Sequence, residues 1–225
     1  KEPFILTRDT SYIGTLIDDL VTKGTEEPYR IMTSRSEYRL LHRQDNADQR
    51  LTHIGAKVGL VPPERLAAVE EKYEQVRREV RRLESSGVPA SEELNAMLAA
   101  KDTAPVANSA RLADLLRRPQ VSYADIAPFD TQRPELSAAV TEEVEIQIKY
   151  AGYLARQEKQ VAEFKKEESR LLPEDMDYNA IHGLRLEARQ KLSQIRPMSI
   201  GQAGRISGVS PADIAVLLIW LEQQK

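Results

Sequence analysis

The chain has 225 residues, of which 30% are charged and 5% aromatic, and its net charge is −3. It contains no cysteine, which excludes disulfides, cysteine-ligated zinc, iron–sulfur clusters and thiol nucleophiles, and its three histidines stand far apart. No apolar run approaches the roughly 20 residues of a membrane helix, and the acidic balance argues against a uniformly basic nucleic-acid binder.

The pattern of apolar residues predicts helices along most of the chain. Its clearest example is Glu64–Glu84, where apolar residues recur every three or four positions and form one stripe. No Gly-rich nucleotide-binding loop and no convincing strand series occurs, so the predicted fold class is all-α, with bundle-like helical subdomains. The other predicted helices are, in chain order, 12–21, 34–43, 45–58, 91–100, 109–117, 141–166, 184–195, 199–207 and a buried final helix at 211–223.

Changes in composition predict three segments. Residues 85–108 are rich in Ser, Gly, Pro and Ala and are interpreted as a linker that contains one short helix. The predicted divisions are therefore a first segment, a first helical subdomain with its linker, and a C-terminal helical subdomain, at 1–44, 45–108 and 109–225.

A column of arginines is the first candidate for chemistry. Ser34 and Glu37 have the spacing of a capping box, which predicts a helix from Ser34 to about Arg43. In that helix Arg35, Arg39 and Arg43 stand four residues apart on one face. Such a column suits a polyanion laid across it, and it suits an acidic neighbouring helix equally well.

The predicted long helix at 141–166 carries the second candidate. Its apolar faces predict that it is mostly buried, while Lys149, Gly152, Tyr153 and Arg156 share a further face. A glycine in mid-helix costs about 1 kcal/mol against alanine and usually marks a close approach by another backbone. Basic and aromatic groups around it suit a phosphate and a base, but tight helix–helix packing explains the pattern as well.

The third candidate resembles a helix-turn-helix at residues 199–223. Its final helix offers no Arg, Lys, Gln or Asn to read a base edge, so no duplex DNA partner is expected. On the preceding helix, Gln202 and Arg205 are predicted to be exposed polar groups. We find no isolated carboxylate pair and no metal-ligand spacing, so no catalytic or metal site is predicted in this chain.

Five sequence blocks resemble one family in the same order. The chain is similar to the tRNA uridine 5-carboxymethylaminomethyl modification enzymes, also called the glucose-inhibited division protein A family. The blocks are Tyr12–Arg30, Thr33–Arg35 with Glu37–Leu40, Asp45–Asp48, Ile148–Tyr150 with Gly152–Tyr153, and Ser199–Ala203. The chain departs from the family pattern at Ser36, where Ala is common, and at Ala151, where many relatives carry Glu.

The resemblance implies the C-terminal helical domain of a larger cytoplasmic FAD-dependent enzyme. Such an enzyme acts with a GTPase partner on C5 of the tRNA wobble uridine, using NADH and methylene-tetrahydrofolate, and is expected to be a homodimer. Its FAD domain lies outside this chain, whose first residue is Lys1 rather than an initiator Met. The chain alone is therefore expected to bind no cofactor and to be inactive.

The same resemblance implies two tRNA- or substrate-binding sets. The alternative, favoured by the acidic net charge, is a module that docks only protein, either the GTPase or a second copy. The first set is Arg30, Arg35, Arg39 and Arg43, and the second is Lys149, Tyr150, Arg156, Gln202 and Arg205.

Overall fold

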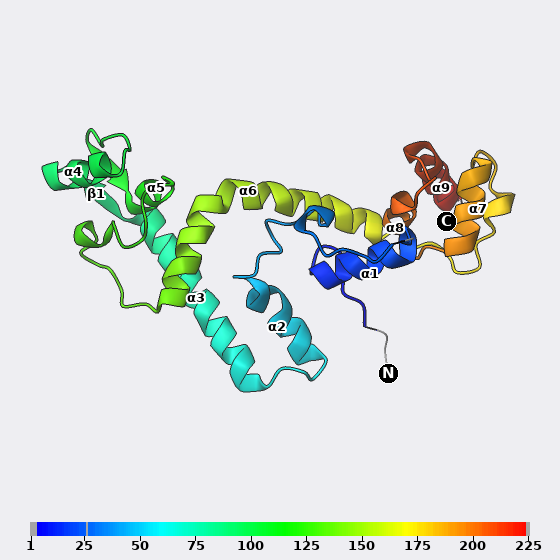
Figure 1. The fold of residues 1–225 in the computed structure, drawn as a ribbon, viewed down its shortest axis with the longest axis horizontal. Coiled ribbons are helices and arrows are strands. Elements are labelled where there is room, and N and C mark those ends of the chain that lie inside the picture. The colour runs from blue at the N-terminus through cyan, green and yellow to red at the C-terminus, as the bar shows by residue number, and fades with distance from the viewer. Residues whose placement is uncertain (1–3, 26, 224–225) are drawn as a thin grey trace. The chain divides into compact units, whose positions relative to one another are not determined.

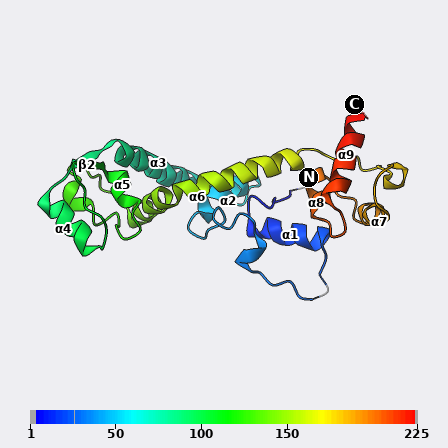
Figure 2. The ribbon, with the colours of Figure 1, turned by 90° about the horizontal axis from the view of Figure 1, so that it is seen from above.

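The computed structural model describes residues 4–25 and 27–223, and these are mainly helical, which confirms the predicted all-α class (Figures 1 and 2). The chain forms two compact units. The terminal unit combines the residues up to His42 with those from Arg156 on, and the central unit is Arg43–Ala155. Within the described ranges, no helix is both long and apolar enough to cross a lipid bilayer.

These two units do not coincide with the segments 1–44, 45–108 and 109–225. The core of the central unit takes side chains from both sides of residue 108, since Leu83 and Leu98 belong to the same buried cluster as Leu116 and Val144. The terminal unit joins two stretches that are distant in sequence. Pairings of this kind leave no local signal in composition, which is why the boundaries differ.

The central unit is built on helix α3. It begins and ends within one residue of the predicted helix, and Pro63 occupies its first turn, where the missing N–H would have no intrahelical partner. Val69, Tyr73 and Val76 lie on its buried stripe. The elements of the unit are α2 (Ala47–Lys57), α3 (Pro63–Ser85), β1 (Gly87–Pro89), α4 (Glu92–Ala100), β2 (Ser109–Arg111), α5 (Leu112–Leu116), the 3₁₀ helix η2 (Ala127–Phe129) and the first part of α6 (Ala138–Glu168).

The predicted linker at 85–108 is wrong. Strand β1 pairs antiparallel with β2, so that Val88 lies opposite Ala110, and Leu94 and Leu98 of α4 are fully buried. The predicted helix at 109–117 is accordingly a strand for three residues and becomes α5 only at Leu112. Strands this short are too brief to show an alternating pattern in the sequence.

Helix α6 extends the predicted 141–166 helix at both ends but is not mostly buried. Val140, Val144 and Ile148 lie in the core of the central unit, whereas Tyr150 and Tyr153 are exposed. In the first turns of α6 the apolar residues are therefore buried as predicted, whereas the apolar residues Tyr150 and Tyr153 further along the helix are exposed.

The terminal unit has a second, separate core. Leu192 of α7, Ile206 and Leu217 of α9 are almost completely buried there. The predicted burial of the final helix holds only for one side, because Ile219 is 57% exposed. The elements of this unit are α1 (Tyr12–Thr22), the 3₁₀ helix η1 (Thr33–Arg35), the rest of α6, the 3₁₀ helix η3 (Tyr178–Ala180), α7 (Leu186–Ile195), α8 (Ile200–Arg205) and α9 (Pro211–Gln223).

The helix predicted from Ser34 to Arg43 does not form. A single 3₁₀ turn, η1, is followed by turns, and Ser36 is buried with its hydroxyl 3.0 Å from His42 Nδ1. Glu37, which would complete the capping box, instead accepts a hydrogen bond from Arg8 at 2.7 Å. An ion pair with a residue far away in sequence thus replaces the local cap.

The start of α9 is held by a carboxylate that serves two neighbours. Asp213 Oδ2 accepts hydrogen bonds from the backbone and hydroxyl of Ser210 at 2.8 and 2.7 Å, and from Arg185 Nη2 at 2.6 Å. Hydrogen bonds from Arg185 hold the pKa of Asp213 far below its usual range, even though its burial acts in the opposite direction.

An Asp213→Asn variant is therefore expected to lose about 1–2 kcal/mol in free energy of unfolding at neutral pH, because the charge-assisted bonds become neutral ones. Since a lowered pKa adds stability only above the pKa of the unfolded chain, the difference from wild type narrows as the pH falls below about 4. Urea titrations at neutral and acid pH measure this difference, and a constant difference across that range contradicts the assignment.

Candidate functional site

The four arginines predicted to share one helix face do not form a column. Arg30, Arg35 and Arg39 lie in the terminal unit, on irregular chain, η1 and a turn, and all three are exposed. Arg43 lies in the central unit, where its Nη2 is 3.0 Å from Asp45 Oδ2 and 3.5 Å from Glu143 Oε1. The set therefore consists of three exposed cations and one that is paired inside its own unit.

Arg35 is held in place by its neighbours. Its guanidinium lies 4.4 Å from the centre of the Tyr29 ring, and the Tyr29 hydroxyl donates to Asp19 at 2.8 Å. Burial on its own raises the pKa of Asp19, but hydrogen bonds from Lys23, Tyr29 and Arg8 outweigh it and lower the pKa. Asp19 is thus a fixed anion that anchors Tyr29, and Tyr29 in turn supports the Arg35 cation.

Arg8 is the centre of this network and was missed by the sequence analysis. Its side chain is 2% exposed and lies 3.0 Å from Asp18, 2.7 Å from Asp19 and 2.7 Å from Glu37. Burial disfavours the cation, yet hydrogen bonds to Glu37 and Asp19 raise the pKa of Arg8. Nothing in the local sequence marks a buried arginine whose partners lie up to 29 residues away.

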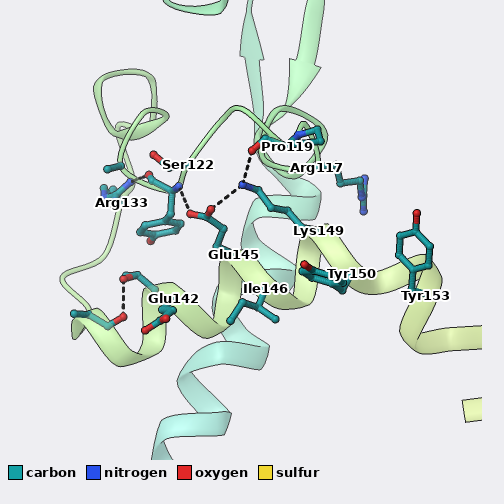
Figure 3. A pocket seen from close by; sticks show the side chains of 14 residues that line it. Arg117, Pro119, Ser122, Arg133, Glu142, Glu145, Ile146, Lys149, Tyr150 and Tyr153 are labelled. Atoms are coloured by element: carbon teal, nitrogen blue, oxygen red, sulfur yellow. Dashed lines mark hydrogen bonds and ion pairs between the residues drawn. The ribbon is translucent and has the colours of Figure 1, made fainter. Parts of the chain in front are cut away.

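A groove in the central unit collects part of the second predicted set (Figure 3). It has a volume of about 1000 Å³ and lies between the first part of α6 and the chain that follows α5. Arg117 and Pro119 line it on one side, and Lys149, Tyr150 and Tyr153 line it from α6. Lys149 and Tyr150 were predicted, while Arg117, at the end of α5, was not, because its place here depends on how α5 and the chain after it pack against α6.

Lys149 joins the two walls of the groove. Its ammonium lies 2.7 Å from Glu145 Oε1 and 3.2 Å from the Pro119 carbonyl oxygen, and Glu145 Oε2 accepts the backbone N–H of Tyr123 at 2.8 Å (Figure 3). The side chain of Lys149 is 18% exposed. Its first role is thus to fasten the chain that follows α5 to α6.

Tyr123 forms a rigid part of the groove wall. Its hydroxyl donates to the buried Glu79 at 2.8 Å, and the Arg133 guanidinium lies 3.8 Å from its ring centre. Burial, followed by the hydrogen bond to Glu79, raises the pKa of Tyr123 further above neutral pH. These contacts fix the position of the Tyr123 ring in the groove wall.

The exposed end of the groove carries two tyrosines. Tyr150 is 41% and Tyr153 is 55% exposed, with ring centres 6.4 Å apart and planes inclined by 54°. A Cβ placed on Gly152 between them would meet no atom within 4 Å. The described structure therefore leaves space for a side chain at this position. Arg156 follows on the same helix and is exposed.

The prediction that Arg205 is an exposed group is wrong. Its Nε and Nη2 lie 2.7 and 2.9 Å from the two oxygens of Asp18, its Nη1 lies 2.5 Å from Glu168 Oε1, and its side chain is 17% exposed. Gln202 accepts the backbone N–H of Met198 at 2.6 Å and is half-buried. Arg205 thus connects α8 to α1 and α6, whereas the contact of Gln202 is local to the start of α8.

Taken together, these arrangements suit binding. In residues 4–25 and 27–223, no group of three His, Cys, Asp or Glu side chains is arranged to hold a metal ion. The exposed cations and aromatic rings, by contrast, are the groups that contact phosphates and bases.

Comparison with known proteins gives the fold its context. The model of the "tRNA modifying enzyme MnmG/GidA C-terminal helical domain" matches residues 63–158, and that of the corresponding C-terminal helical bundle matches residues 160–225. In a crystal structure of Aquifex aeolicus GidA, 34% of the chain superposes on 98% of this one, with a TM-score of 0.83 and 40% identity.

Two curated relatives carry the name tRNA uridine 5-carboxymethylaminomethyl modification enzyme MnmG. The protein of Caldicellulosiruptor saccharolyticus is 55% identical over 225 residues, and that of Lachnoclostridium phytofermentans is 54% identical over 223. The matches cover 100% and 99% of this chain and 36% of each relative, so the chain spans about a third of their length.

The fold and these matches define a helical module of a tRNA-modifying enzyme. The chain belongs to the MnmG/GidA family and corresponds to its C-terminal helical domains.

Proposed function

We propose that this chain is the tRNA- and GTPase-binding region of an enzyme that modifies C5 of the tRNA wobble uridine. The names of its relatives support the reaction class. In this proposal the chemistry belongs to an FAD domain outside the chain, which uses NADH and methylene-tetrahydrofolate in a cytoplasmic homodimer. The chain itself contributes recognition.

The observation that carries the tRNA proposal is the exposed arginine set of the terminal unit. Arg30, Arg35 and Arg39 are exposed, and none of the three forms an ion pair within the described ranges. Arg8 binds Asp19, Asp19 accepts the Tyr29 hydroxyl, and the Tyr29 ring contacts the Arg35 guanidinium. Lys and Arg that neutralise phosphates release counterions, so such contacts dominate affinity and make it depend on salt.

An Arg35→Ala, Arg39→Ala double variant is expected to bind tRNA more weakly and with a flatter salt dependence. If each arginine neutralises one phosphate, the logarithmic salt slope falls by about 2. Filter binding of the 225-residue chain to tRNA over a range of salt concentrations measures both quantities.

The matched control is an Arg77→Ala, Arg81→Ala variant, because it removes the same charge from a solvent-exposed face of α3, where these side chains are 55% and 69% exposed. We expect it to change affinity less than the first variant. Equal effects of the two variants would show that only net charge matters, and this result contradicts the assignment to Arg35 and Arg39.

A protein-docking role is the second candidate. One face of α1 exposes apolar side chains, with Ile13, Ile17 and Val21 each between 50% and 58% exposed. Contiguous exposed apolar residues are typical of protein interfaces. Retention of the GTPase by the chain, together with no shift of tRNA in a gel titration, supports this role and removes the tRNA proposal.

A further inference from the structure

We propose that Ile31 acts as an apolar wedge in the RNA: its side chain enters the base stack beside the target uridine and fills the space that this base leaves. This inference rests on the proposed tRNA binding and specifies how the chain helps to expose the uridine. Enzymes that do chemistry on a base take it out of its stack, and proteins that open a stack insert apolar side chains such as Ile or Met between neighbouring bases.

Ile31 lies at the surface of the arginine-bearing segment of the terminal unit. Its side chain is 78% exposed, and that of Met32 beside it is 46% exposed. Arg30 precedes this pair and Arg35 follows it, and both arginines are exposed. Single apolar side chains are common on protein surfaces, but this one stands between two cations that suit phosphates. The charge on both sides therefore favours a polyanion as the ligand of this apolar side chain.

Contacts on both sides of Ile31 hold the segment in place. The Met32 carbonyl oxygen accepts the backbone N–H of Arg35 at 3.0 Å, at the start of η1. Before Ile31 in the chain, the Tyr29 hydroxyl donates to Asp19 at 2.8 Å. The centre of the Tyr29 ring also lies 4.4 Å from the Arg35 guanidinium. A side chain on a held segment loses less conformational entropy on binding than one on a flexible loop.

The hollow beside Ile31 is too small to receive a base. Ile31 and Met32 line it together with Tyr12, Ile13 and Tyr29, and its volume is about 70 Å³. Pockets that hold small ligands have volumes of about 300–1,000 Å³. Because a base does not fit into this hollow, close apolar contact with the RNA is made by a side chain that enters the RNA instead.

The wedge and the arginines contribute to affinity in different ways. A contact between an arginine and a phosphate releases counterions, so its contribution falls as the salt concentration rises. Burial of the Ile31 side chain removes apolar surface from water and releases no counterions. Truncation of Ile31 is therefore expected to lower the affinity without changing its salt dependence, whereas truncation of Arg35 and Arg39 flattens that dependence.

The first test follows the opening of the stack directly. The fluorescent base 2-aminopurine is placed next to the wobble uridine in a tRNA anticodon stem–loop, which is titrated with the 225-residue chain. Stacking on other bases quenches 2-aminopurine, so its fluorescence is expected to rise when the wild-type chain binds. Ile31→Ala is expected to bind without this rise, and Ile31→Leu, which keeps an apolar side chain of the same size, is expected to retain it.

The second test measures affinity by filter binding over a range of salt concentrations. Ile31→Ala is expected to weaken tRNA binding about 5- to 30-fold with the logarithmic salt slope unchanged. Leu60→Ala is the matched control, because Leu60 is 81% exposed and belongs to the central unit rather than to the arginine-bearing segment. We expect it to bind as wild type. Circular dichroism checks that these exposed substitutions leave the helices intact.

The outcomes separate the wedge from the proposed function. If the wild-type chain binds the stem–loop without a rise in fluorescence, or if Ile31→Ala matches wild type in both tests, the wedge is overturned and the tRNA proposal stands. An equal loss of affinity in Leu60→Ala also overturns the wedge. If Ile31→Ala loses the GTPase but keeps its tRNA affinity, Ile31 is a protein contact and not a wedge. If the wild-type chain binds no tRNA, both proposals are contradicted.

Discussion

Replacing Arg8 with alanine is expected to lower the free energy of unfolding of the terminal unit by about 3–5 kcal/mol, as removing one partner of a buried ion pair does. The guanidinium is 2% exposed and lies within 3.0 Å of Asp18, Asp19 and Glu37. Without it, Asp19, whose side chain is 3% exposed, keeps Lys23 and Tyr29 as its side-chain partners among residues 4–25 and 27–223. Urea titration followed by circular dichroism measures the loss.

Two matched variants sharpen this result. Arg8→Lys keeps the charge, but one ammonium cannot reach three carboxylates in the way a planar guanidinium does, so we expect an intermediate loss of stability. Arg170→Ala removes an exposed arginine from the same unit and should change stability by less than about 0.5 kcal/mol. A loss below about 1 kcal/mol in Arg8→Ala would show that the buried carboxylates find other partners.

The second large effect is expected for Arg82→Ala in the central unit. Arg82 Nη2 lies 2.7 Å from Glu79 and 2.5 Å from Asp130, and both carboxylate side chains are 2% exposed. Truncation leaves two buried anions without their shared cation, and we expect a loss of about 3–5 kcal/mol. Hydrogen exchange followed by mass spectrometry should place the increase in exchange on α3 and on the segment around Asp130.

Arg81→Ala is the natural control, because Arg81 is the next residue on α3 and is 69% exposed. Its expected effect on stability is within about 0.5 kcal/mol. Because Glu79 also accepts the Tyr123 hydroxyl, Arg82→Ala is further expected to loosen one wall of the groove. Increased exchange that is spread evenly over both compact units would contradict the local role assigned to Arg82.

Elements with long periodic patterns of apolar residues were predicted more accurately than short elements. Helix α3 was predicted almost to the residue, because its buried stripe repeats over several turns. The helix predicted at 34–43 was wrong, because Glu37 pairs with Arg8 and Ser36 contacts His42. A capping box predicted from local spacing does not form when one of its residues instead makes an ion pair with a residue distant in sequence, as Glu37 does with Arg8. Strands β1 and β2 are three residues each. They are separated in sequence by α4, so no local pattern predicts that they pair.

The candidate site was predictable to a lesser extent. Spacing singled out Lys149 and Tyr153, the family resemblance added Tyr150, and all three line one groove in the structure. Arg117 joins them only because α5 and the chain after it fold back on α6. Arg205 has the residue type of an anion contact, but its exposure was decided by Asp18, a residue 187 positions earlier. The sequence gives the charge and type of each residue directly, whereas the burial of a side chain depends on the whole fold.

The discontinuous terminal unit has a consequence for how the chain is made. Arg205 and Asp18 can meet only after the whole central unit has left the ribosome, which takes on the order of ten seconds or more at ordinary rates of synthesis. The central unit, whose residues are contiguous, can complete its core during that interval. Until α8 emerges, the carboxylate of Asp18 lacks its contacts with Arg205. Synthesis therefore imposes an order on folding, because the segment around α1 is made before the residues of α8 that it contacts.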